Sequence, residues 1–184
     1  RQLGISTLSA AYSLWLMLFH NDKNVLCIAT AKDTAKNLVT KVRIMYDGLP
    51  HWLKTAIVEN NKLSLRFING SQIKAIASNE SAGRSEALSL LIVDEAAFVR
   101  NFDELWMGLY PTLSTGGRAI ILSTPNGVGG QYHKLYTDAL DELNDFNPVT
   151  LPWDVHPERD ENWFKKETAN MTKRQVAQEL MCDF

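Results

Sequence analysis

The chain has 184 residues, of which 45% are hydrophobic and 22% are charged. This composition predicts a folded protein with a well-filled core and excludes a disordered chain. The formal net charge of −2 excludes a uniformly basic nucleic-acid binder, although a local basic face would not show in this sum. Cys27 and Cys182 lack metal-ligand spacing, which is typical of a reduced intracellular protein. No apolar run reaches the roughly 18 residues of a membrane span, so we expect no membrane partner.

Short apolar runs alternate with segments of helical character along the whole chain. In chain order, the expected elements are a helix at 7–19, a strand at 24–30, a helix at 33–46, strands at 63–68, 72–77 and 88–93, a helix at 102–113, a strand at 118–122 and helices at 131–143, 161–171 and 172–181. The pair Asn69-Gly70 between two alternating runs predicts an antiparallel hairpin. The pattern as a whole predicts an α/β fold with a mostly parallel central sheet flanked by helices.

The first motif that carries chemistry is the segment Arg1-Gln2-Leu3-Gly4-Ile5-Ser6-Thr7, where a glycine and two hydroxyl residues open a helix. Unpaired backbone N–H groups and the positive end of the helix dipole bind phosphate oxygens at such a position. In the phosphate-loop pattern G-x-x-x-x-G-K-[ST], Gly4 fits the last glycine and Ser6 fits the magnesium-binding hydroxyl. Ile5 stands where the lysine is expected. An ordinary Ser/Thr helix cap is the alternative interpretation.

The second motif is a run of four aliphatic residues that ends at Asp94-Glu95. An apolar strand that delivers two adjacent acids predicts a Walker B element, in which the first acid holds Mg²⁺ and the second orients the attacking water. Side chains alternate along a strand, so the two carboxylates can serve different tasks. A solvated acidic turn is the alternative interpretation.

The third motif is the polar end of the strand at 118–122, where Ser123-Thr124 precedes Pro125-Asn126-Gly127. In motor ATPases such a strand end senses the γ-phosphate, whereas the same residues also form an ordinary turn. The order of the three motifs decides between these interpretations. A phosphate loop, an acidic strand and a polar-tipped strand are arranged in this order in P-loop ATPases of the additional-strand type.

Three segments together closely resemble the large terminase subunits of tailed bacteriophages: Arg-Gln-Leu-Gly before a helix, Ile-Val-Asp-Glu-Ala-Ala-Phe, and Leu-Ser-Thr-Pro-Asn-Gly. The ending at 178–184 also resembles the junction before the nuclease domain of that family. The resemblance covers essentially the whole chain. It implies that 1–184 is a single P-loop ATPase domain, truncated at its N-terminus inside the phosphate loop and cut before a C-terminal nuclease domain.

The resemblance also implies a set of functional residues. Its phosphate loop comprises Arg1, Gln2, Leu3, Gly4, Ile5, Ser6 and Thr7. Ser6 and Asp94 are expected to hold Mg²⁺, and Glu95 is expected to be the catalytic acid. Ser123 and Thr124 match the motif that couples hydrolysis to movement.

Two arginines are further candidates for catalysis. Arg84 lies eleven residues before Glu95, where some family members have an arginine that reaches the ATP of a neighbouring subunit. Such an arginine neutralises charge on the transferred phosphoryl group. A surface arginine on a polar loop is the alternative interpretation of Arg84. Arg1, or a lysine upstream of it, can supply the positive charge that Ile5 lacks.

The implied function is ATP-driven packaging of double-stranded DNA into the procapsid, with ATP and Mg²⁺ as cofactors. The implied partners are double-stranded DNA, the portal protein, the small terminase subunit and further copies of the chain in a ring on the portal. The expected location is the cytoplasm of the infected host, transiently at the portal. Two alternatives stay open: another nucleic-acid ATPase or helicase of the D-E-x-x type, and a catalytically silent nucleotide- or DNA-binding assembly module in which Ile5 marks a lost site.

Overall fold

The computed structural model describes residues 3–78 and 87–184 of the chain. The described residues group into two compact units. One unit, here called the sheet unit, covers Gly4–Leu122 in its described residues, and the other, here called the helical unit, covers Ser123–Phe184 together with Leu3. The predicted single domain over 1–184 stays a prediction.

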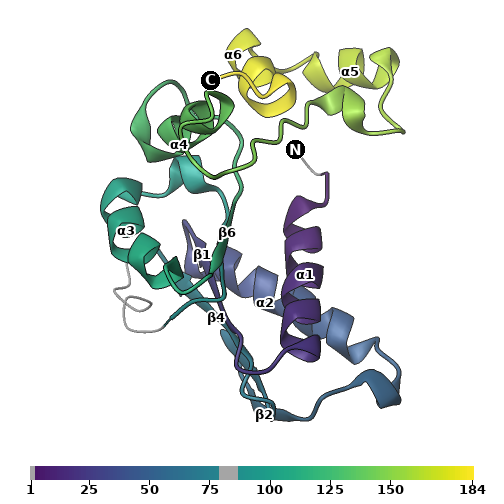
Figure 1. Cartoon of the computed structure of the whole chain (residues 1–184). Helices are drawn as coiled ribbons and strands as arrows, with labels where there is room; N and C mark the ends of the chain where they lie inside the picture. The colour runs from purple at the N-terminus through teal and green to yellow at the C-terminus, as the bar shows by residue number, and fades with distance from the viewer. Residues whose placement is uncertain (1–2, 79–86) are drawn as a thin grey trace. The chain divides into compact units, whose positions relative to one another are not determined.

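The sheet unit alternates helices and strands in the predicted manner (Figure 1). Its helices and strands are α1 (Ile5–Phe19), β1 (Asn24–Ala29), α2 (Lys32–Asp47), β2 (Ile57–Asn60), β3 (Ser64–Phe67), β4 (Gln72–Ala77), β5 (Leu90–Val93), α3 (Phe102–Leu109) and β6 (Arg118–Ile121), with short 3₁₀ turns at His51–Leu53, Ala96–Phe98 and Tyr110–Leu113.

The strands form one sheet in the order β2-β3-β4-β1-β5-β6. Strands β4, β1, β5 and β6 are parallel to one another, whereas β2 and β3 pair in the antiparallel sense with each other and with β4. This arrangement confirms the predicted α/β fold, including the hairpin at Asn69-Gly70. Because β1, β5 and β6 are parallel neighbours, their carboxyl ends meet at one edge of the sheet, where binding sites of such folds lie.

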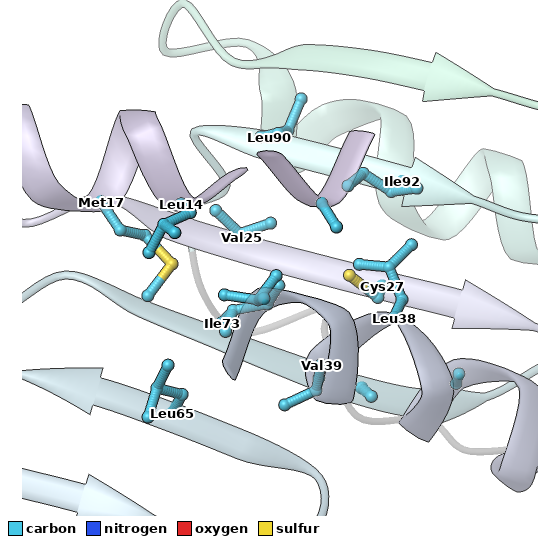
Figure 2. Close-up of a cluster of buried hydrophobic side chains, with 14 of the residues drawn as sticks. Leu14, Met17, Val25, Cys27, Leu38, Val39, Leu65, Ile73, Leu90 and Ile92 are labelled. Carbon is cyan, nitrogen blue, oxygen red and sulfur yellow. The ribbon is translucent and has the colours of Figure 1, made fainter. Parts of the chain in front are cut away.

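One cluster of buried side chains joins α1 and α2 to the sheet (Figure 2). Leu14 and Met17 of α1 pack with Leu38 and Val39 of α2 against alternate residues of the strands. The strand residues in this cluster include Val25, Cys27, Leu65, Ile73, Leu90 and Ile92. Helix α3 lies on the opposite side of the sheet from α1 and α2 (Figure 1). Both faces of β1 and β5 are therefore covered, which explains their continuous apolar sequences.

The helical unit contains α4 (Gly130–Leu140), α5 (Glu161–Thr168), α6 (Lys173–Val176) and a π-helical turn at Ala177–Met181. Aromatic contacts hold it together. Trp153 stacks on Phe164 with ring centroids 4.6 Å apart, and Tyr132 and Tyr136 contact Phe184. None of the helices in the two described ranges is long and apolar enough to cross a membrane.

Several elements differ from the predicted ones; the helices expected at 131–143 and 161–171, for example, end at Leu140 and Thr168. The structure adds strand β2, which sequence analysis missed because its residues are mostly exposed at the sheet edge. Helix α3 ends at Leu109 and a 3₁₀ turn with Pro111 follows, since proline lacks the N–H that a continuing helix needs. The helix expected at 172–181 is α6 followed by the π-helical turn.

Candidate active site

The start of α1 has the backbone geometry that a phosphate-binding turn requires. Gly4 precedes the helix in the left-handed region, with a φ of 78° that glycine adopts without strain. The first hydrogen bond along the helix runs from the backbone N–H of Leu8 to the carbonyl of Gly4. The N–H groups of Ile5, Ser6 and Thr7 therefore precede the helical ladder and have no acceptor within it. Arg1 and Gln2 lie outside the described residues.

The two predicted magnesium ligands lie together although 88 positions separate them in the sequence. The Ser6 hydroxyl donates a hydrogen bond of 2.9 Å to the Asp94 carboxylate. Asp94 comes directly after β5, and its backbone N–H donates to the carbonyl of Ile28 on the neighbouring strand β1. The start of α1 and the end of β5 thus converge at the carboxyl edge of the sheet. The role of Ser6 and Asp94 as magnesium ligands stays a prediction.

Glu95 projects from a turn with an unusual backbone conformation. Its φ and ψ are 55° and 40°, in the left-handed region that few non-glycine residues adopt. Its backbone N–H donates to the Asp94 carboxylate over 3.1 Å, and its side chain is exposed. Strained residues of this kind concentrate at functional sites, because the surrounding structure must hold them in place.

A threonine that sequence analysis did not single out holds the Glu95 carboxylate. The Thr30 hydroxyl, directly after β1, donates to Oε2 of Glu95 over 3.1 Å. Thr30 and Glu95 meet because β1 and β5 are parallel neighbours that end at the same edge. The sequence did contain one indication of this role, because Thr30 is a polar residue at the carboxyl end of an apolar strand. Its contact with Glu95 could be inferred only once the order of the strands was known.

Cys27 lies on β1 close to the acids but has a structural role. It is 1% exposed and belongs to the cluster of Figure 2. Burial raises the pKa of its thiol far above the ordinary range, and the nearby charge of Asp94 raises it further. The thiol is therefore protonated at neutral pH and is a poor nucleophile.

The donor set fits Mg²⁺. A hydroxyl oxygen and a carboxylate oxygen are hard ligands, and Mg²⁺ typically takes one or two carboxylates and completes its shell with water and substrate phosphates. Within residues 3–78 and 87–184, no cluster of three or more His, Cys, Asp or Glu side chains offers an all-protein metal site. Ser6 and Asp94 thus suit a metal ion that arrives with a nucleotide.

Three predicted residues remain: Arg84, Ser123 and Thr124. Arg84 lies outside the described residues. Ser123 and Thr124 follow β6 and belong to the helical unit, where the Ser123 carbonyl accepts a hydrogen bond from the Tyr132 hydroxyl. In the sheet unit, Leu122 fixes the end of β6 beside Asp94 and Glu95. Its backbone N–H donates to the Val93 carbonyl, and its carbonyl accepts from the backbone N–H of Ala96.

A glycine-led helix start beside an acidic strand end, on a mostly parallel sheet, defines a protein with the P-loop nucleoside triphosphatase fold. Over residues 1–184 the chain also matches the family model described as terminase large subunit, T4likevirus-type, N-terminal. The chain belongs to this family of large terminase subunits.

Solved structures of phage terminases share the fold. The large terminase ATPase domain of Thermus phage P74-26 is 22% identical with a TM-score of 0.74, and the match covers 100% of this chain and 85% of that one. The large terminase of a thermophilic bacteriophage, in complex with ATP-gamma-S, is 14% identical with a TM-score of 0.73, covering 98% and 44%. The HK97 bacteriophage large terminase is 15% identical with a TM-score of 0.71, also covering 98% and 44%. The chain thus spans less than half of each of the latter two proteins.

Proposed function

We propose that this chain is the ATP-hydrolysing motor domain of a terminase that drives double-stranded DNA into the procapsid. The observation that carries the proposal is the 2.9 Å contact between Ser6 and Asp94, with Glu95 next in sequence. It joins a phosphate-binding helix start to a pair of acids, as phosphoryl transfer requires. Structures of the thermophilic phage terminase in complex with ATP-gamma-S and with ADP support nucleotide binding by this family.

Each residue of the site has a chemical task in this proposal. The N–H groups at the start of α1 hold the phosphates of ATP, and Ser6 and Asp94 hold Mg²⁺. The metal ion, when bound, neutralises charge on the β- and γ-phosphates. Glu95 orients the attacking water, while Thr30 fixes one oxygen of the Glu95 carboxylate and leaves the other for that water.

The wider machinery is part of the same proposal. Arg84 or Arg1 would stabilise charge on the transferred phosphoryl group, and Ser123 and Thr124 would couple hydrolysis to movement of the DNA. The partners would be double-stranded DNA, the portal protein, the small terminase subunit and further copies of the chain in a ring. The site of action would be the cytoplasm of the infected host, at the procapsid portal. A nuclease would lie in a C-terminal domain.

The test is ATP hydrolysis by the full-length protein, with and without double-stranded DNA, in wild type, Glu95→Gln and Glu104→Gln. Glu104 is an exposed acid in the first turn of α3, so its substitution removes the same charge elsewhere in the sheet unit. We expect turnover to fall by about two to four orders of magnitude in Glu95→Gln, with ATP still bound and Glu104→Gln unaffected.

The other outcomes separate the alternatives. Equal and negligible ATP turnover in all three proteins, with nucleotide still bound, would indicate a catalytically silent assembly module. DNA-stimulated hydrolysis together with strand separation would indicate a helicase. Full activity in Glu95→Gln would remove Glu95 from the mechanism.

A further inference from the structure

Ile5 leaves the start of α1 without the cation that its pattern predicts. Phosphate groups at this position carry negative charge, and the backbone N–H groups of Ile5, Ser6 and Thr7 offer only partial positive charge. An aliphatic side chain adds none. If the chain binds ATP as proposed above, positive charge for the phosphates has to come from outside this turn: from Mg²⁺, from Arg1, or from a side chain of another element.

Helix α2 brings a lysine to this position. The ammonium Nζ of Lys41 donates a hydrogen bond of 2.9 Å to the Thr7 hydroxyl, directly after Ser6. Leu38 and Val42, in the same stretch of α2, are 4% and 0% exposed, so the backbone of Lys41 is fixed in the packed layer. Thr7 is the partner that the structure gives to this ammonium, and no carboxylate among the described residues pairs with it.

We propose that Lys41 is a nucleotide-binding residue that supplies, from α2, the positive charge missing at Ile5. This inference rests on the proposed ATPase function, and its ligand is the polyphosphate group of a nucleoside triphosphate. Its position differs from the Walker lysine, since it reaches the helix start from the neighbouring helix and through Thr7.

The hydrogen-bond chemistry of the Lys41–Thr7 pair supports this role. An ammonium group has three donors and no acceptor, so the Thr7 oxygen must accept in this contact. The O–H of Thr7 is then left to donate to a phosphate oxygen. Two further N–H groups of Lys41 remain for the same anion. Lys41 therefore orients Thr7 as a donor and also places a full charge beside it.

The expected effect follows from the distances. A phosphate oxygen bonded to Thr7 would lie roughly 4.5–5 Å from Nζ, because a hydrogen bond of about 2.7 Å meets the observed 2.9 Å contact at the bent angle of a hydroxyl oxygen. At that separation and with the high effective dielectric of a half-exposed site, removal of the charge should weaken binding about fivefold to tenfold. The weakening should shrink as salt is added, because salt screens exposed charges.

The test is the dissociation constant of Mg²⁺·ATP for the full-length protein, measured by calorimetry at low and high ionic strength. The variants are Lys41→Met, Lys41→Arg, Thr7→Val, the Lys41→Met/Thr7→Val double variant, and the matched control Lys62→Met. Lys62 is exposed in the turn between β2 and β3, so its loss changes net charge equally. Thermal unfolding of every variant is measured in parallel.

We expect Lys41→Met to bind about fivefold to tenfold more weakly at low salt and to approach wild type at high salt. Lys41→Arg should recover most of the affinity, and Lys62→Met should match wild type. The double variant should lose less binding free energy than the two single variants lose together, since both residues act through one contact.

Two results would overturn the assignment while leaving the proposed function intact. One is unchanged affinity in Lys41→Met while wild type binds and hydrolyses ATP, which would leave the charge to another residue such as Arg1. The other is an equal loss of affinity in Lys41→Met at both ionic strengths, together with a lower unfolding temperature. That result would show that Lys41 only joins α1 to α2. If the wild-type protein binds no nucleotide, both the assignment and the proposed function fall.

Discussion

Thr30→Val should lower ATP turnover without unfolding the protein. The substitution is nearly isosteric and removes the hydroxyl that donates to Oε2 of Glu95. Without this bond the Glu95 carboxylate can rotate, and a smaller fraction of molecules presents it to the attacking water. Substrate binding should be unaffected, because neither atom of this contact belongs to the start of α1. The change should therefore appear in kcat and not in KM.

The size of the effect follows from the geometry. The O–O distance of 3.1 Å is longer than the ~2.7–2.8 Å typical of hydroxyl donors, and the Glu95 side chain is exposed. The bond therefore belongs near the lower part of the range for hydrogen bonds, about 0.5–1.5 kcal/mol. If the whole of this lower-range energy, about 0.5–1 kcal/mol, acts on the transition state, kcat falls by about twofold to fivefold. The free energy of unfolding should change by less than about 1 kcal/mol, as for other exposed charged contacts.

The assay is steady-state phosphate release, with kcat and KM determined separately and unfolding followed in urea. Thr112→Val is the matched control, because the Thr112 hydroxyl bonds to the Leu109 carbonyl away from the acids in the same unit. An unchanged or higher kcat in Thr30→Val would refute the reasoning. A drop in kcat that is matched by Thr112→Val, or that accompanies an equal rise in KM, would also contradict it.

Three further predictions concern stability. Gly4→Ala should lower the free energy of unfolding by about 1–2 kcal/mol through its φ of 78° alone, since no atom lies within 4 Å of an added Cβ; an unchanged urea midpoint would contradict this. Phe67→Ala should cost about 3–5 kcal/mol, because the ring is 0% exposed and contacts Tyr46 at 5.2 Å; urea unfolding that loses less than about 2 kcal/mol would count against the packing. Burial and the Asp94 charge raise the pKa of the Cys27 thiol, so its contribution to stability is complete below about pH 8.5 and falls by about 1.4 kcal/mol per pH unit above it, as the unfolded thiol ionises. Unfolding at pH 8 and pH 10 should show a shallower slope in Cys27→Ala than in wild type; the raised pKa of Cys182 adds a slope of the same sign to both proteins. Equal slopes would disprove the buried, protonated thiol.

Much of the sheet unit could be predicted because its sequence signals are local. Continuous apolar runs identified β1, β5 and β6, and Asn69-Gly70 identified the hairpin of β3 and β4. The contact between Ser6 and Asp94 was predictable in outline, since parallel strands place their carboxyl ends at one edge. Such predictions need only periodicity and the rules of α/β folds.

The parts that were missed depend on contacts between distant segments. Strand β2 has three exposed residues out of four, so it carries no buried pattern and is stabilised by pairing with β3. Thr30 is one hydroxyl residue among many until β1 and β5 are known to be neighbours. A side chain of this kind becomes functional through register, which the sequence of its own segment does not encode.

Ile5 shows how a residue pattern and a binding site can differ. The pattern requires a lysine at one position of the loop, whereas a phosphate group requires positive charge within a few ångströms, from any element. Coulomb energy depends on distance and dielectric and is indifferent to order along the chain. Lys41 stands 34 positions after Thr7, yet the two side chains are 2.9 Å apart. An aliphatic residue in the lysine position is therefore weak grounds for inactivity as long as a neighbouring helix carries a cation to the same turn.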